Sequence, residues 1–154
     1  MPQFGKTSLQ KLNTCDTKIQ DICNEAIKYI DFSIITGHRT KEEQDSLYPK
    51  FTKVKWPNGK HNDLPSKAVD VAPYIKPYGV IFGSKEQVEN IMIISNRSEL
   101  EVKAFIKKSY SRLIGFLEAI AALKDIDIRV GIDWDGDFDM LDQSFNDLGH
   151  LELK

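Results

Sequence analysis

Two histidines and an aspartate, far apart along the chain, constrain what this sequence can fold into more than any other feature. His61 precedes Asp70 by nine residues, and Asp147-Leu148-Gly149-His150 follows near the C-terminus. Two imidazoles and a carboxylate can fill three positions around Zn²⁺, and catalytic zinc sites keep a fourth position for water or substrate. A fold that brings these segments together would therefore support metal-assisted hydrolysis, with Asp147 as a second carboxylate nearby.

Composition narrows the class of protein. The 154 residues suffice for one domain with a buried core, and we expect a single domain over residues 1–154. The chain has 21 Lys and Arg against 23 Asp and Glu, and no basic stripe interleaved with aromatic residues, so nucleic acid is not an expected partner. Cys23 falls among apolar residues at helical spacing, which favours a buried thiol over a disulfide with Cys15.

The pattern of apolar residues predicts neither a signal peptide nor a membrane span. The first residues, Met1 to Lys6, include no apolar signal-peptide core, and the longest apolar run, Ile91 to Ile94, is far shorter than a span. We therefore expect no signal peptide and no membrane insertion.

Hydrophobic periodicity predicts a mixture of helices and strands without a βαβ rhythm. Asp16 and Thr40 stand where helix N-caps are expected, and Thr40 with Glu43 forms a capping-box pattern. The order favours an α+β fold with a small, mainly antiparallel sheet packed with helices. The expected helices cover 16–30, 40–47 and a segment that includes 105–123 and starts near 96–101, and the expected strands cover 31–36, 67–72, 127–132 and 150–153.

The three candidate metal ligands lie in the expected loop or on the expected strands, at places where they could bind a metal ion. His61 lies in a loop rich in Pro, Gly, Asn and Lys, and His150 opens the last strand. Asp70 lies on a strand and shares a face with Ala68 and Ala72, whose small side chains leave room for a metal ion. An unpaired carboxylate is costly to bury, so a metal is a better explanation for Asp70 than a plain core position.

These segments together resemble the M15 family of zinc peptidases, and in particular the phage endolysins of that family, the L-alanyl-D-glutamate peptidases. The resemblance implies the Hedgehog/D-Ala-D-Ala-peptidase fold, with Zn²⁺ as cofactor. The stretches that carry it span nearly the whole chain: 36–44, 61–74, 131–137 and 147–153.

Carried over residue by residue, the resemblance implies that His61, Asp70 and His150 bind zinc, that Asp147 is the general base and acid, and that Arg39 polarises the scissile carbonyl. Three departures stand out. The first His and the Asp are nine residues apart where many relatives have seven. Gly59 replaces a frequent Ser, and Asp147 stands where Glu is common.

The resemblance also implies a function and its setting. We expect an endolysin that hydrolyses the L-alanyl-D-glutamate bond of peptidoglycan stem peptides and so lyses bacteria. It would be a monomeric catalytic domain without a separate cell-wall-binding domain. It would be made in the host cytoplasm and would reach the wall in the periplasm through a separate membrane-permeabilising protein. Two alternatives stay open: a D-alanyl-D-alanine carboxypeptidase or dipeptidase, and a non-catalytic metal-binding module of the same fold.

Three further features have two interpretations each. His38 could replace a metal ligand, but a substrate contact or a solvated side chain is favoured by its place beside Arg39. The alternating aspartates from Asp133 to Asp139 could bind Ca²⁺, yet they depart from the EF-hand pattern and fit a solvated acidic loop better. Trp134 could stack on a substrate or fill the core.

Overall fold

A small antiparallel sheet lies at the centre of the computed structural model, which describes residues 1–154. The strand order is β1-β2-β5-β4, and the two-residue β3 pairs with the distal half of β2, which confirms the expected α+β class with a small antiparallel sheet. The strands are β1 (Phe32–Thr36), β2 (Ala68–Ile75), β3 (Gly79–Val80), β4 (Ile128–Val130) and β5 (His150–Leu153).

Five α-helices and one short 3-10 helix surround this sheet. The Asp16 side chain caps α2, and full capping boxes start α3 at Thr40 and α5 at Ser98, as the sequence predicts for Asp16 and Thr40. No helix is both long enough and apolar enough to span a membrane. The helices are α1 (Lys6–Leu12), α2 (Thr17–Ala26), α3 (Lys41–Leu47), η1 (Lys60–Asn62), α4 (Lys85–Ser95) and α5 (Glu99–Leu123).

The main core forms where the apolar face of the sheet meets α2 and the C-terminal half of α5. Alternate residues of β2 and β5, Val69 and Leu151 among them, are fully buried there. They pack in one cluster with Ile19 and Ile22 of α2 and with Leu117 of α5. Asp70 and His150 fall on the opposite face by the same alternation.

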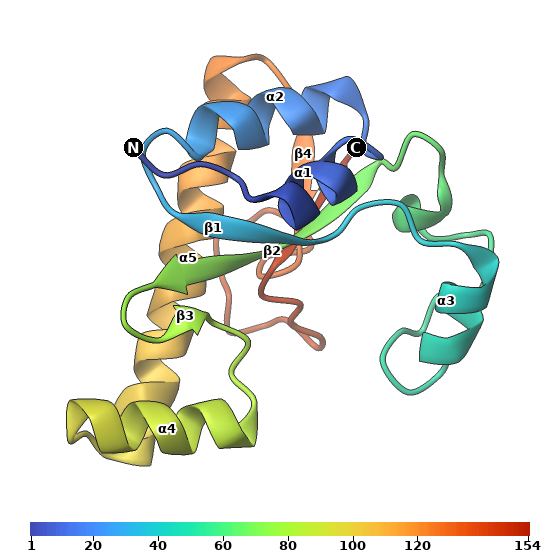
Figure 1. The fold of residues 1–154 in the computed structure, drawn as a ribbon. Coiled ribbons are helices and arrows are strands. Elements are labelled where there is room, and N and C mark those ends of the chain that lie inside the picture. Colours follow the sequence, from blue (N-terminus) through green and yellow to red (C-terminus); the bar gives the residue numbers. More distant parts are fainter.

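A second, smaller core joins α4 to the N-terminal half of α5. In Figure 1, α5 runs the length of the molecule, with α2 near its C-terminal end and α4 across its N-terminal end. Val88 and Ile91 of α4 pack here with Ile106 and Tyr110 of α5 and with Ile81, which follows β3. Figure 1 also shows α3 standing apart from both cores, at the end of a long loop excursion.

The structure differs from the sequence-based expectations at several elements. Helices α1 and α4 were not predicted, because α1 is short and because α4 buries only Val88 and Ile91 while Ile93 and Ile94 face solvent. Strand β2 continues through Pro73, whose missing N–H is tolerated at this position while its carbonyl accepts from Ile81 N. The expected helix 16–30 ends at Ala26, and the expected strand 127–132 covers only Ile128–Val130.

Both cysteines are buried and unpaired. Cys15 and Cys23 belong to the main core, and their thiols are free. The expectation of a buried thiol at Cys23 is confirmed.

Candidate metal centre

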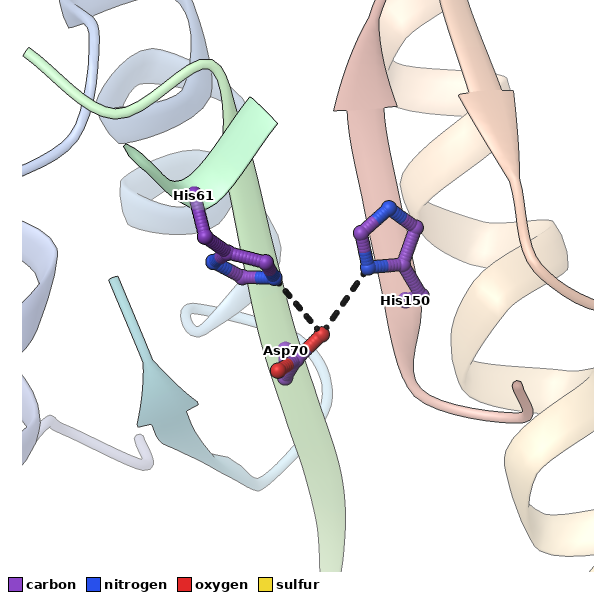
Figure 2. Close-up of side chains that lie close together, drawn as sticks. All are labelled: His61, Asp70 and His150. Carbon is purple, nitrogen blue, oxygen red and sulfur yellow. Dashed lines mark hydrogen bonds and ion pairs between the residues drawn. The ribbon is translucent and has the colours of Figure 1, made fainter. Parts of the chain in front are cut away.

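The pairing register of β2 and β5 places Asp70 directly opposite His150. Residues opposite each other in an antiparallel pair project to the same face, so the carboxylate and the imidazole meet without any contribution from loops. Figure 2 shows the Asp70 carboxylate between the two imidazoles, with His61 arriving from η1. His150 Nδ1 is 3.0 Å and His61 Nε2 is 3.1 Å from the same oxygen, Oδ1 of Asp70.

A backbone carbonyl fixes the orientation of His61. Its Nδ1 lies 2.7 Å from the carbonyl oxygen of Gly37, which can only accept, so Nδ1 carries a proton and Nε2 is the nitrogen directed at Asp70. Gly37 itself must lack a side chain, because a Cβ there would lie 2.3 Å from the carbonyl oxygen of Lys11 and 2.4 Å from Oγ1 of Thr14. The end of β1 therefore reaches the His61 ring only because residue 37 is glycine.

A buried carboxylate fixes the orientation of His150 in the same way but through the other ring nitrogen. His150 Nε2 lies 3.0 Å from Oε2 of Glu152, which is two residues further along β5 on the same face. Arg129 of β4 donates through Nε to Oε1 of Glu152 at 2.9 Å and also pairs with it through a second guanidinium nitrogen. Glu152 and Arg129 were missed by the sequence analysis, although an acid two positions after a candidate ligand on the same strand is a usable signal.

The charges of the centre depend strongly on one another. Burial alone would raise the pKa of Asp70, but the charge of His61 and the hydrogen bonds from both imidazoles outweigh it and hold that pKa well below its usual range. Burial would lower the pKa of His150, yet the hydrogen bonds to Asp70 and Glu152 raise it to about 9. Asp70 and His150 therefore favour each other's charged forms.

Arg39 reaches the centre from the segment between β1 and α3. Its guanidinium lies 3.3 Å from Oδ2 of Asp70, the oxygen that the imidazoles leave free, and 3.1 Å from Oε1 of Gln44. Gln44 is buried and is held by Asn62 and by the carbonyl of Val54. The structure thus places Arg39, a candidate from the sequence, beside Asp70, and Gln44, which contacts Arg39, was not anticipated.

Asp147 lies in a tight turn just before His150. Its backbone N–H donates to the Gly131 carbonyl at 2.9 Å, and a Cβ at Gly131 would lie 2.3 Å from the Asp147 carbonyl oxygen, so glycine is required for this close approach. The side chain is half-buried. Burial and the negative charge of Asp70 raise the pKa of Asp147, against smaller lowering effects from His150, His61 and Arg39. Asp147 is thus in electrostatic contact with the whole centre.

The remaining candidates lie outside the trio. His38 Nδ1 is engaged by the carbonyl oxygen of Asp63 at 2.9 Å. Trp134 is half-buried, with its ring 5.4 Å from the His150 ring and stacked on Phe145 at 6.5 Å. In the acidic loop, both carboxylate oxygens of Asp133 accept backbone N–H groups, from Gly136 and Phe138, which gives Asp133 a structural role.

The donor set fits a divalent cation with nitrogen and oxygen preferences. One ligand atom each from His61, Asp70 and His150 lies within 4.8 Å of the others, and no fourth His, Cys, Asp or Glu joins them. Each imidazole donates one N–H to a protein acceptor outside the trio and directs its other nitrogen inward, which is the orientation that metal-binding histidines adopt. Three protein ligands are typical of catalytic sites, whereas structural zinc sites are closed by four. His61, Asp70 and His150 thus form a possible metal site.

Comparisons with known proteins were made for sequence and for structure. A model of the phage L-alanyl-D-glutamate peptidase family matches residues 1–103, which include Arg39, His61 and Asp70. A search of curated proteins finds no match. Among solved structures, the L-Ala D-Glu endopeptidase ChiX of Serratia marcescens matches this chain with a TM-score of 0.64 and 16% sequence identity. The match covers 99% of this chain and 90% of the ChiX chain, which shows a shared fold. Because the family model covers well over half of the sequence, the chain belongs to the phage L-alanyl-D-glutamate peptidase family, and the predicted peptidase activity on peptidoglycan is confirmed at that level.

Proposed function

We propose that this chain is a zinc-dependent endolysin that cuts the bond between L-alanine and D-glutamate in peptidoglycan stem peptides and thereby lyses bacterial cells. The observation that carries the proposal is the convergence of His61, Asp70 and His150, whose ligand atoms lie within 4.8 Å of one another. Family membership supplies the substrate class, peptidoglycan. We infer that the protein acts on the cell wall.

The three ligands would hold Zn²⁺ through Nε2 of His61, a carboxylate oxygen of Asp70 and Nδ1 of His150. In neutral imidazoles, these two nitrogens would be the ones without a proton, because the other nitrogen of each ring donates to Gly37 or Glu152. When bound, zinc supplies Lewis-acid chemistry, which polarises a carbonyl and lowers the pKa of water. The remaining steps belong to residues of this chain.

Asp147 is the proposed proton carrier. A carboxylate oxygen of Asp147 would take the proton of the attacking water and return it to the nitrogen of the leaving D-glutamate. Its raised pKa suits this role, because a general base works best when its pKa approaches the working pH. Burial and the charge of Asp70 raise that pKa, and no hydrogen bond stabilises its ionised form. No covalent intermediate with the protein is required.

Arg39 would stabilise the negative charge that develops on the carbonyl oxygen of L-alanine. Only 15% of its side chain is exposed, and its guanidinium is directed at the centre by Gln44 and Asp70. A preorganised cation at such a position acts on the transition state without paying for reorientation. In the peptide complex, we expect a guanidinium N–H to donate to the carbonyl oxygen.

Digestion of purified sacculi tests the proposal. Protein stripped with a chelator should be inactive, and added Zn²⁺ should restore activity. Mass spectrometry of the released fragments should find new free α-amino groups on D-glutamate and new carboxyl ends on L-alanine. Cleavage between D-alanines instead would identify a carboxypeptidase or dipeptidase, and a zinc-loaded protein that cuts nothing would identify a non-catalytic module.

A histidine pair provides the matched control. His61→Ala should lose both bound zinc and activity, whereas His38→Ala should keep its zinc because the His38 ring is engaged by Asp63 outside the trio. Equal zinc content in the two variants would contradict the assignment of His61.

A further inference from the structure

His150 is one of four side chains that form a closed ring of contacts. His150 Nε2 lies 3.0 Å from Oε2 of Glu152. The other carboxylate oxygen, Oε1, accepts a hydrogen bond from Arg129 Nε at 2.9 Å. The Arg129 guanidinium lies over the Trp134 ring at 5.3 Å, and Trp134 lies against the His150 ring at 5.4 Å with 36° between the planes. His150 is thus held at its edge by Glu152 and at its face by Trp134.

Three of the four side chains come from the sheet, and Trp134 comes from the loop after β4. Arg129 of β4 is the register partner of Glu152, and His150 precedes Glu152 by two positions on the same face of β5. Glu152 is only 6% exposed, while the Arg129 side chain is 44% exposed. A buried carboxylate therefore sits between a cation that can reach solvent and an imidazole that points into the metal centre.

We propose that Glu152 is a positioning residue that keeps the His150 proton on Nε2 and so presents Nδ1 to the metal, with Arg129 fixing which oxygen Glu152 offers. The inference rests on the proposed function, since it assigns a purpose to one ligand of that centre. It concerns a residue that the reaction itself does not touch.

The physical argument begins with the number of protons. When a cation occupies the centre, Nδ1 of His150 and the Asp70 carboxylate would both bind it, and the imidazole keeps one N–H. An ionised carboxylate can only accept, so Nε2, which faces Glu152, must then carry that proton. The other nitrogen then keeps its lone pair for a cation. His61 is held in the opposite form, because its Nδ1 faces the Gly37 carbonyl. The two histidines should therefore bind the metal through different nitrogens.

The division of the two Glu152 oxygens makes the proposal testable with an isosteric variant. Glu152→Gln keeps the size of the side chain but leaves one oxygen and one NH₂ group. Arg129 only donates, so it claims the single oxygen, and the NH₂ group then faces His150 and favours the proton on Nδ1. The variant should thus bind zinc poorly although it fills the same space.

Removal of Arg129 should reverse that loss. In the double variant Arg129→Ala/Glu152→Gln, the amide can turn its oxygen to His150 and restore the proton to Nε2. Arg129→Ala alone should change zinc affinity by less than about fivefold, because a partly exposed ion pair contributes little. A purely structural role for Glu152 predicts no such rescue.

The experiment measures zinc affinity by chelator competition in six proteins: the natural chain, Glu152→Ala, Glu152→Gln, Arg129→Ala, the double variant and Glu118→Ala. Glu118 is a half-buried carboxylate on α5 outside the ring of contacts and serves as the matched control. We expect roughly 10- to 100-fold weaker binding for Glu152→Ala, at least about tenfold for Glu152→Gln, and recovery of most of this in the double variant. Glu118→Ala should bind like the natural chain.

A second readout follows the proton directly. The chain has three histidines, so ring ¹⁵N resonances of the zinc-loaded protein can be assigned. His150 should keep its proton on Nε2 and His61 on Nδ1. A His150 proton on Nδ1, or unchanged zinc affinity in Glu152→Gln, would overturn the inference while leaving the proposed function intact. A natural chain that binds no zinc would instead defeat the proposed function.

Discussion

Successive residues of β2 and β5 point to opposite faces of the sheet, and different interactions stabilise the two faces. One face presents Val69 and Leu151 to α2 and α5, and the other presents Asp70, His150 and Glu152. The apolar face is stabilised by buried area, which is nondirectional and tolerates exchange between side chains of similar volume. The polar face is stabilised only by particular partners at particular atoms, because each buried charge must be matched.

We therefore expect that the stability of the fold and the chemistry of the metal centre can be altered separately, even at neighbouring residues. Changes to the polar face should reduce metal binding or catalysis and leave the fold in place. Changes to the apolar face should reduce the free energy of unfolding and leave the folded fraction active. The variants below test this separation, from the largest expected effect to the smallest.

Removal of the central carboxylate should have the largest effect. Asp70→Asn keeps the volume of the side chain but removes the charge that both imidazoles and Arg39 share. We expect loss of bound metal and of all measurable cleavage of sacculi, with the circular dichroism spectrum of the folded protein retained. Metal analysis and turbidity of sacculi measure the two outcomes. A variant that unfolds at room temperature would show that the two faces are not separable.

Asp147→Asn should have the second largest effect. We expect the rate to fall by about 10²- to 10⁴-fold, because a proton carrier is removed while the three proposed ligands remain. Zinc content should equal that of the natural chain, and this distinguishes the variant from Asp70→Asn. Full activity would refute the role of Asp147.

The pH dependence of the natural chain gives an independent check on the same residue. Activity requires the ionised carboxylate, so kcat/KM should fall as the pH drops through the pKa of Asp147. Because burial and the charge of Asp70 raise that pKa, the acid limb should lie above the usual range of an aspartate. The limb should be absent from the residual activity of Asp147→Asn.

How far the sequence predicts this site depends on which interaction places each residue. The trio and Arg39 could be anticipated because chemistry restricts metal ligands to few residue types, and because alternation places Asp70 on one face of a strand. Arg129 depends on the register between β4 and β5, which the sequence does not specify locally, whereas Glu152 follows His150 by two positions on the same strand face.

The elements of the fold also divide into those that a local sequence pattern predicts and those that it does not. Helix α2 was predictable because Asp16 caps it and Ile19, Ile22 and Cys23 share one buried face. Helix α4 was not, since two of its isoleucines are exposed and its apolar pattern is therefore not helical in period. Local patterns predict an element when its buried face is complete within the element, and they fail when packing with a distant partner decides.

Truncation on the apolar face should affect stability alone. Leu151 lies between His150 and Glu152 in sequence, but its side chain is fully buried in the main core. Leu151→Ala should lower the free energy of unfolding by about 2–5 kcal/mol through lost burial and an incompletely filled cavity. Urea denaturation measures this. Zinc affinity and kcat/KM of the folded protein should stay close to natural values, and a large loss of either would mean that the faces are coupled.

The smallest effect is expected at α3, which belongs to neither face but supports Arg39. This helix buries only Gln44 and starts at a capping box in which Thr40 Oγ1 accepts from Glu43 N and Thr40 N donates to Glu43. Thr40→Ala should cost about 0.5–2 kcal/mol, and that cost should be local. Because α3 stands apart from both cores, hydrogen exchange in α3 should quicken while the main core keeps its protection. Since Gln44 holds the Arg39 guanidinium, kcat should fall modestly with zinc affinity unchanged. Faster exchange throughout the sheet would instead place α3 within the cooperative core.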